Sequence, residues 1–381
     1  MSQLNVKNLS NENEDGAPEI ANISDFSATS YMYPPKGTTA QRPSSPNPGD
    51  IRFNTDTASL EYYKGNTIGW TQIEMTSTEP LGGGTGSNAG TGARGFQAGY
   101  HVSGDTIEYI TISTLGDSQD FGNLSSGRYN SGYTAGNENR MVFAGGYYVN
   151  VIDYWTVQSL GNALDFGDLT EPRQSMSGVN DKIRAIWAGG QGPGHNRENT
   201  IDYVAIQSTG NAVDFGDLNV EQNTHSAVSS STRGIWCANT SYPVHGDLQY
   251  VNIRTTGNTV DFGTIGVGLN FQSGGGSSAT RGMFSGGYIS NSISYVTMAT
   301  TGNSIDFGDT TTRRYYYNNM TSPTRCVFGA GLTVPSAVKS NVMDYVEIAT
   351  TGNAVDFGDM AFLSSQGYSG GGSNAHGGLS G

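Results

Sequence analysis

A sequence unit that ends in Asp-Phe-Gly recurs along most of this chain and constrains its fold more than any other feature. Two clear copies are IDYVAIQSTGNAVDFGDL from Ile201 and MDYVEIATTGNAVDFGDM from Met343. The Asp-Phe-Gly tripeptides begin at Asp120, Asp165, Asp214, Asp261, Asp306 and Asp356. Their spacing of roughly 45 to 50 residues is the period of β-propeller blades. The repetition therefore predicts a series of similar structural units and not a single site.

Each unit also carries an earlier segment that is typical of a β-strand. Its copies are ARGFQAGY (93), NRMVFAGGY (139), IRAIWAGG (183), TRGIWCAN (232), TRGMFSGGY (280) and TRCVFGAG (324). With a small-residue strand such as HSAVSS at 225, the unit becomes four strands, which is the make-up of a propeller blade. Apolar residues lie on both faces of these strands, so a unit can bury them only against its neighbours.

The turns and the chain ends bear on how the units close. Gly-Asn pairs at 161/162, 210/211, 257/258, 302/303 and 352/353 suggest two-residue hairpin turns between the third and fourth strands. Six complete units favour six blades, with SGGGSNAHGGLSG (369–381) completing the ring beside the first Arg-bearing strand. AHGGLSG also has the look of a degenerate seventh copy of that strand, which leaves seven blades as the alternative.

The N-terminal fifth of the chain has a different character. Residues 1–35 are polar and aperiodic, so we expect an extended arm that orders against a partner or a disordered tail. Residues 36–76 contain three short strands, Ile51–Asn54, Leu60–Tyr63 and Trp70–Ile73, which form a small meander. Three such strands make a marginal core, so this meander is expected to oligomerise or dock. A Gly-rich linker, 77–91, leads to the propeller, 92–381.

Composition excludes several classes of function. The formal net charge is −14, which disfavours binding to nucleic acid and to anionic membranes. No apolar run is long enough to insert into a membrane, and the first residues lack the features of a signal peptide, so we expect synthesis without Sec export. Cys237 and Cys326 are the only cysteines, and we expect both to be small buried apolar residues.

Two resemblances accompany these patterns. An aromatic strand ending in Gly-Gly, a variable loop, a tyrosine-bearing strand and an aromatic fourth strand resemble the kelch motif, although Phe replaces its usual Trp. The segment GTTAQRP…GDIRFNTDT…LEYY…W and the DYVTI…TTGNA…DFGDL type of repeat are similar to virion proteins of marine tailed phages. The resemblance implies an all-β, kelch-like propeller on a virion structural protein of tail-fibre or capsid-fibre type.

The second resemblance implies that the protein recognises the host surface. It also implies two kinds of partner, other virion proteins (tail, portal-adaptor or capsid) and a host glycan or protein. A homotrimer is expected, as in many phage fibres. The first alternative is a purely structural protein that decorates or bridges the capsid or tail. The second is a polysaccharide-degrading enzyme, because paired carboxylates cannot be recognised from sequence spacing alone.

The residue patterns favour packing over catalysis. The Asp of each Asp-Phe-Gly repeats in step with Arg94, Arg140, Arg184, Arg233, Arg281 and Arg325, so we predict structural Arg–Asp ion pairs. The five histidines share no ligand spacing, and no nucleophile motif is present. We therefore predict no catalytic residue, no metal and no cofactor.

The loops that vary between copies are the candidate recognition surface. They follow the Gly-Gly strand and the Asp-Phe-Gly strand, and in an up-and-down unit both sets emerge on one face. The alternative is that these loops drift because nothing constrains them. The proposed binding residues are Arg313, Arg314, Tyr315, Tyr316, Tyr317, His195 and Arg197. Their aromatic and cationic groups suit contact with a sugar or a protein.

Overall fold

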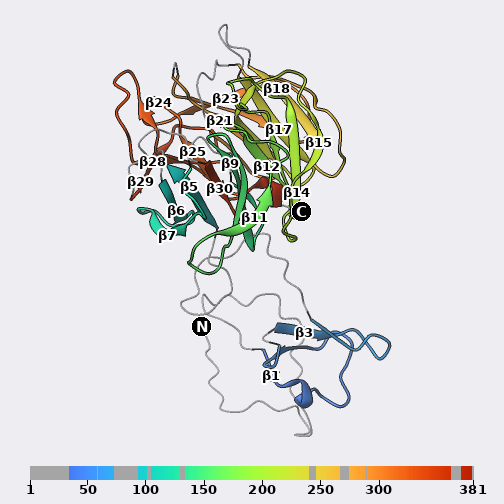
Figure 1. Ribbon diagram of the computed structural model, residues 1–381. Coiled ribbons are helices and arrows are strands. Elements are labelled where there is room, and N and C mark those ends of the chain that lie inside the picture. The colour runs from blue at the N-terminus through green and yellow to red at the C-terminus, as the bar shows by residue number, and fades with distance from the viewer. Residues whose placement is uncertain are drawn as a thin grey trace, which may run out of the picture. The chain divides into compact units, whose positions relative to one another are not determined.

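The computed structural model describes residues 34–57, 59–72, 93–100, 104–128, 134–239, 246–266, 274–288, 290–361 and 370–379. The chain divides into two compact units, Met1–Thr76 and Ser77–Gly381. The expected linker and nearly all of the expected N-terminal arm lie outside the described residues. Both units are built almost entirely of β-strands (Figure 1).

The first unit contains one four-stranded sheet, in the order β1-β2-β3-β4. Its elements are β1 (Lys36–Gly37), the 3-10 helix η1 (Thr39–Gln41), β2 (Ile51–Asn54), β3 (Ser59–Tyr63) and β4 (Trp70–Gln72). The three predicted strands are confirmed to within one residue. The sequence pattern missed β1, which pairs parallel to β2, because two residues are too few to show a period.

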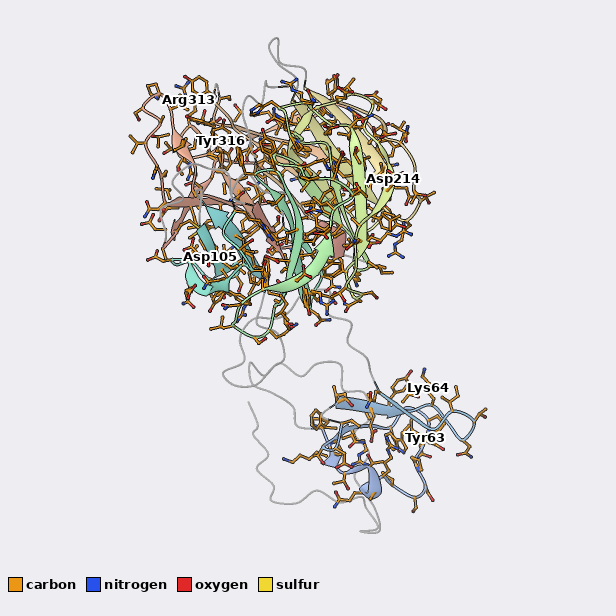
Figure 2. The ribbon with its side chains drawn as sticks, viewed as in Figure 1. Tyr63, Lys64, Asp105, Asp214, Arg313 and Tyr316 are labelled. Atoms are coloured by element: carbon orange, nitrogen blue, oxygen red, sulfur yellow. The ribbon has the colours of Figure 1, made fainter. Side chains whose placement is uncertain are left out.

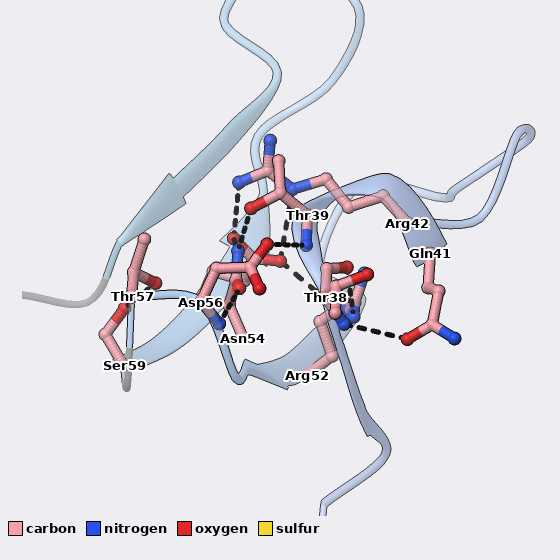
Figure 3. Close-up of polar contacts among 10 residues, drawn as sticks. Thr38, Thr39, Gln41, Arg42, Arg52, Asn54, Asp56, Thr57 and Ser59 are labelled. Atoms are coloured by element: carbon pink, nitrogen blue, oxygen red, sulfur yellow. Dashed lines mark hydrogen bonds and ion pairs between the residues drawn. The ribbon is translucent and has the colours of Figure 1, made fainter.

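The protected face of this small sheet carries buried charged side chains (Figure 3). Glu61 is fully buried, forms an ion pair with Arg42 at 2.6 Å and lies 3.6 Å from the guanidinium of Arg52. Asn54 donates to the same carboxylate at 3.1 Å. Hydrogen bonding from Arg42 lowers the pKa of Glu61. The protected face of this sheet therefore combines a charged network around Glu61 with the packing of Tyr63 against Trp70, whose ring centroids lie 5.5 Å apart.

The opposite face of the small sheet carries apolar side chains. The register pairs Ile51 with Tyr62 and Phe53 with Leu60, so these four residues share a face. Ile51 is 53% exposed, and the other three are half-buried. We define this apolar face by Ile51, Phe53, Leu60 and Tyr62; it is partly open to solvent, and Lys64 lies 5.1 Å from the centroid of the Tyr62 ring.

The second unit contains six four-stranded antiparallel sheets among its described residues. Sheet 1 consists of β30 (Gly370–Ser373), β5 (Arg94–Tyr100), β6 (Gly104–Thr111) and β7 (Gln119–Asn123). Sheet 2 consists of β8 (Thr134–Gly136), β9 (Arg140–Gly146), β10 (Val149–Thr156) and β11 (Leu164–Asp168). Sheet 3 consists of β12 (Ser177–Asn180), β13 (Arg184–Ala188), β14 (Thr200–Ala205) and β15 (Val213–Asp217).

The remaining three sheets follow the same plan. Sheet 4 consists of β16 (Asn223–Ser229), β17 (Arg233–Asn239), β18 (Asp247–Asn252) and β19 (Val260–Thr264). Sheet 5 consists of β20 (Gly275–Ser277), β21 (Arg281–Ser285), β22 (Ser292–Thr297) and β23 (Ile305–Asp309). Sheet 6 consists of β25 (Asn318–Thr321), β26 (Arg325–Gly329), β28 (Val342–Glu347) and β29 (Val355–Asp359), while β24 (Arg314–Tyr315) pairs with β27 (Leu332–Thr333) beside it. This all-β arrangement is compatible with a β-propeller.

The C-terminal segment pairs with the first repeat, as predicted. Gly370 lies opposite Ala98 and Ser373 opposite Gly95, so β30 completes sheet 1 from the far end of the chain (Figure 1). The interpretation of AHGGLSG as a seventh copy of the Arg-bearing strand is wrong, because Gly377–Leu379 forms a 3-10 turn (η2). The backbone of Gly378 lies too close to the carbonyl of Asn180 to admit a Cβ atom.

Apolar clusters form between consecutive sheets. One joins Trp187 of sheet 3 to Ile152 and Phe166 of sheet 2. The same kind of cluster joins the last sheet to the first, with Met343 of sheet 6 packed near Ile110 of sheet 1. Each sheet thus buries its faces against its neighbours, which is how repeat units obtain a core. Cys237 and Cys326 are free and buried, as predicted, and burial raises the pKa of Cys237 to about 12.

The repeated Arg does not pair with the repeated Asp, so that prediction is wrong. Each Arg guanidinium lies over the Tyr ring of the adjacent strand, at 4.3 to 5.0 Å from the ring centroid. It also donates to a backbone carbonyl of the next sheet, as Arg184 does to Ile253 at 3.2 Å. Arg325 of sheet 6 donates to Ile112 of sheet 1 at 3.3 Å, which joins the last sheet to the first.

The Asp-Phe-Gly motif has a different structural role. A β-bulge at this point turns the Phe side chain inward, where it meets the Tyr ring edge to face, as Phe215 does with Tyr203 at 5.7 Å. The Asp side chain is exposed, and Asp214 lies at the outer rim of the sheets in Figure 2. The Gly has a positive φ and lies against the turn of the next sheet.

The Gly-Asn pairs are not two-residue hairpins, because each lies inside a longer connection, such as residues 206–212. They dock onto the preceding sheet instead. Gly210 donates its N–H to the Phe166 carbonyl at 2.8 Å, and Asn211 accepts from the N–H of Asp168 at 3.1 Å. The contact recurs at every junction, and at the last one Gly116 donates to Phe357 at 3.0 Å. We call this four-residue contact the inter-sheet latch.

Substitutions of Asp214 and Arg184 test whether the repeated Asp and Arg stabilise the fold as an ion pair or whether the Arg acts through its Tyr and carbonyl contacts. Asp214→Asn is expected to change the free energy of unfolding by no more than about 0.5 kcal/mol, because the carboxylate is exposed. Arg184→Ala, in the same sheet, should cost about 1.5 to 2 kcal/mol, because it removes a cation–π contact and an inter-sheet hydrogen bond. Urea unfolding of both variants measures the difference. Equal losses would restore the ion-pair hypothesis.

Candidate functional site

A small cavity lies where the inner strands of the six sheets meet. Its lining includes Thr134, Asn180, Ser229, Ser277, Thr321 and Ser373, one residue from each sheet. The space open to water there is about 30 Å³, enough for one or two water molecules and too small for a sugar or a cofactor. This cavity is therefore not the candidate site.

His376 helps to close this cavity. Its Nδ1 accepts the N–H of Gly378 at 3.0 Å, and its Nε2 lies 3.4 Å from the carbonyl of Gly136. The proton of the neutral ring therefore belongs on Nε2. Burial lowers the pKa of His376 to about 4. The C-terminal segment is thus fixed in the centre by a neutral imidazole that holds two parts of the fold together.

Acidification should loosen this segment. The ordinary pKa of histidine is about 6.5, so the unfolded chain binds more protons than the folded protein between pH 6.5 and about 4. Stability should therefore fall as pH drops through that window, by on the order of 3 kcal/mol in total. We expect His376→Gln to show a weaker pH dependence of the melting temperature between pH 7 and pH 4.5. An unchanged pH dependence would show that other groups dominate.

The variable loops are anchored by buried ion pairs. Arg173, in the loop from sheet 2 to sheet 3, pairs with Asp202 at 2.6 Å and donates to the carbonyls of Gly189 and Thr200. Thr170 donates its hydroxyl to the same carboxylate at 2.6 Å. Both charged side chains are fully buried. The loop after Asp-Phe-Gly and the loop after Gly-Gly are thereby fastened to one another on one face, as predicted.

The same anchor occurs in two other loops. Arg128 pairs with Asp153 at 2.7 Å, and Arg314 pairs with Asp344 at 2.6 Å. Sequence reasoning missed these pairs because Arg and Asp lie about 25 to 30 residues apart, at positions that only some repeats carry. These buried pairs tie the described parts of the three loops to the strands beside them.

Aromatic side chains gather on these anchored loops in two groups. In the first, the rings of Tyr147 and Tyr148 lie 4.5 Å apart, and Tyr148 makes an edge contact with His195 at 5.7 Å and a hydrogen bond to its Nδ1 at 2.7 Å. In the second, Tyr315 lies 5.4 Å from Tyr288 and 4.7 Å from Tyr316. We call these the first and second aromatic triads.

The structure divides the predicted binding residues. Arg313 and His195 are exposed, and Tyr315, Tyr316 and Arg197 are half-buried, so these five remain candidates. Figure 2 shows Arg313 and Tyr316 close together on the loop that carries β24. Arg314 and Tyr317 are 1% and 3% exposed. The prediction that these two residues belong to the recognition surface is wrong. Arg314 serves as the loop anchor, and Tyr317 packs against Phe328.

Three aromatic residues were missed by the sequence reasoning. Tyr147 and Tyr288 directly follow the Gly-Gly pair of their repeats, and Tyr148 comes next in sheet 2. Tyr147 is 44% and Tyr288 42% exposed, which is unusual for large aromatic rings. The Gly-Gly-Tyr tripeptide could have indicated these residues. A Tyr that directly follows the end of the strand lies in the loop, where its ring is not packed between sheets.

Carboxylates also occur near the first triad. Burial raises the pKa of Glu198, and the nearby Glu171 and Glu221 raise it further. Within the described ranges, no group of three or more His, Cys, Asp or Glu residues is placed to hold a metal ion. The three carboxylates therefore interact with one another, and the charge of Arg173 opposes their effect on Glu198.

Comparison of the sequence with protein-family models and with curated proteins gives no significant match. Among the described residues, no helix is both long and apolar enough to cross a membrane.

Proposed function

We propose that the six sheets are the blades of a closed, kelch-like β-propeller that displays a recognition face. The support for closure is that the inter-sheet latch, the Arg-to-carbonyl bond and the apolar cluster all recur between the last sheet and the first. Pairing of β30 with β5 adds a fourth link. Electron microscopy of the purified protein should resolve a six-fold pseudosymmetric ring, and a seven-fold or open arrangement would contradict it.

We further propose that this chain is a virion protein of a tailed phage, of tail-fibre or capsid-fibre type, that recognises the host surface. The observation that carries this proposal is the pair of aromatic triads on loops anchored by buried ion pairs. Rigid loops with exposed aromatic rings are suited to recognition, because little conformational entropy is lost on binding. The virion assignment itself is supported by the resemblance of the repeats and of the N-terminal segment.

Cell binding tests the adhesion proposal. Fluorescently labelled full-length protein is expected to bind host cells of susceptible strains and not of resistant ones. An antibody raised against the protein should label particles of the phage at a fibre. Labelling of the particle without any binding to cells would favour the alternative, a decorating or bridging protein. Release of reducing sugar from envelope polysaccharide would favour the enzyme.

The apolar face of the small sheet supports assembly. Ile51, Phe53, Leu60 and Tyr62 would be covered if several copies packed these faces together, and we propose a homotrimer. Light scattering of the full-length protein should give three times the mass of the chain. Ile51→Lys should shift the protein towards monomer while leaving the second unit folded. A monomeric wild-type protein would rule out the trimer.

A further inference from the structure

Two junctions in the ring repeat the same loop architecture. One lies between sheets 2 and 3, the other between sheets 5 and 6, so they are three sheets apart in the series. Each has a buried Arg anchor, Arg173 or Arg314, that donates to the carbonyl of the first residue after one strand and to that of the first residue of the next strand, on either side of the variable loop. Two residues after the anchor, Ser175 has φ 54° and Tyr316 has φ 57°. The second unit thus presents one loop framework twice.

Each framework carries one aromatic triad. The first triad draws Tyr147 and Tyr148 from sheet 2 and His195 from sheet 3. The second draws Tyr288 from sheet 5 and Tyr315 and Tyr316 from the loop to sheet 6. Tyr147 and Tyr288 occupy equivalent positions after Gly-Gly. The other members come from different positions, so similar aromatic groups arise from two different sets of residues.

The backbone at both triads adopts conformations that side chains disfavour. Tyr148, His195 and Tyr316 have φ values of 57°, 66° and 57°, in the left-handed region. Bulky residues are rarely found there, and each costs free energy that glycine would not. In the first triad, the loop is supported by Gln191, whose side chain donates to the His195 carbonyl at 2.9 Å. Three of the six non-glycine residues with positive φ among the described residues thus belong to the triads, the others being Ser175, Ala330 and Ala337.

The chemistry of the triads favours a neutral sugar. Tyrosine and histidine offer apolar ring faces beside hydroxyl and imidazole groups, which match the C–H face and hydroxyl groups of a pyranose. The chain has a formal net charge of −14, which disfavours an acidic sugar overall. Close to the triads the charges are mixed, because Glu198 and Arg197 follow His195 in the sequence and the exposed Arg313 precedes Tyr315.

We infer that the two triads are separate subsites for neutral sugar rings, so that one chain binds an extended host glycan at two points. This inference rests on the proposed function and specifies its ligand. Two linked contacts strengthen binding to a long polysaccharide by raising the effective concentration of the second sugar. Short oligosaccharides would bind each subsite independently and more weakly.

The test uses the full-length protein on an array of neutral and acidic bacterial oligosaccharides, followed by calorimetry with the strongest neutral ligand. Tyr148→Gly and Tyr316→Gly each remove a ring and relieve the positive φ. Each is expected to weaken binding to long polysaccharide by about tenfold, with a melting temperature no lower than that of the wild type. Ser175→Gly is the matched control, since it changes an equivalent backbone position without removing a ring, and should bind normally.

Other outcomes overturn the inference. Unchanged binding in both Tyr variants, or a loss that is accompanied by a lower melting temperature, would leave the triads with a packing role. Preference for acidic sugars would also contradict it. Periodate treatment of host cells, which cleaves sugar diols, separates this inference from the proposed function. Cell binding that survives periodate, with no array signal, would indicate a protein receptor and keep the adhesion proposal. Absence of cell binding would remove the adhesion proposal, while the array would still decide the subsites.

Discussion

Gly263→Ala is expected to destabilise the second unit by about 3 to 5 kcal/mol. Gly263 belongs to Asp-Phe-Gly in sheet 4 and has φ +146°. A Cβ atom there would lie 2.4 Å from the carbonyl oxygen of Gly302, which belongs to the latch of sheet 5. Both atoms are attached to backbone, so neither can move without breaking the Gly302 to Phe262 hydrogen bond of 2.7 Å.

Gly257→Ala provides the matched control for this prediction. Gly257 also lies in the repeat of sheet 4 and has φ +153°, but no atom lies within 4 Å of its Cβ position. It should show only the cost of the backbone conformation, about 1 to 2 kcal/mol. The difference between the two variants in the free energy of unfolding, measured with urea, gives the contribution of close packing at the inter-sheet latch. If the two losses were equal, close docking at the latch would contribute nothing to stability.

Removal of residues 370–381 should have the second large effect. It deletes β30, so the inner edge of β5 loses its partner and an unpaired strand edge with Phe96 and Ala98 becomes exposed. It also removes Asn374, whose side chain accepts the N–H of Arg94 at 2.7 Å, and His376 from the central cavity. We expect the loss of much of the about 5 to 15 kcal/mol that stabilises a domain, together with aggregation.

Calorimetry and size-exclusion chromatography measure this effect. A shorter deletion of Ser380 and Gly381 leaves β30 and η2 in place and serves as the control. A synthetic peptide of residues 370–379, added in excess, should restore part of the lost melting temperature if pairing with β5 is the cause. A truncated protein with an unchanged melting temperature would show that the inter-sheet latch closes the ring without the C-terminal strand.

Local pattern was sufficient for most strands. Three of the four strands of the small sheet and the four strands of each repeat follow from strand-forming residues, turn residues and period, because these depend on residues close in sequence, whereas the two-residue β1 was missed. The pairing of β30 with β5 was also predicted, since each end of the repeat array had incomplete units. The face that carries the variable loops followed from the up-and-down order of the strands.

Side-chain partners were predicted poorly. The repeated Arg and Asp have opposite charge and equal period, and this suggested ion pairs, yet Arg184 meets Tyr203 and a carbonyl of the next sheet. Arg314 and Tyr317 were placed on the surface because their loop varies, but variability does not reveal which members of a loop point inward. The charged network of the small sheet, around Glu61, was not predicted, because Arg42, Arg52 and Glu61 meet only once the strands are paired.

The sequence by itself determined the repeat, its four strands and the loops where the copies differ, because strand alternation and turn preference act over a few residues. Only the tertiary structure decided what the repeated residues contact. The latch on Gly263 comes from the neighbouring sheet, the partner of Tyr148 is His195 of another loop, and His376 reaches Gly136 across the centre. Such contacts depend on how sheets pack side by side, which the spacing of residues along the chain does not encode.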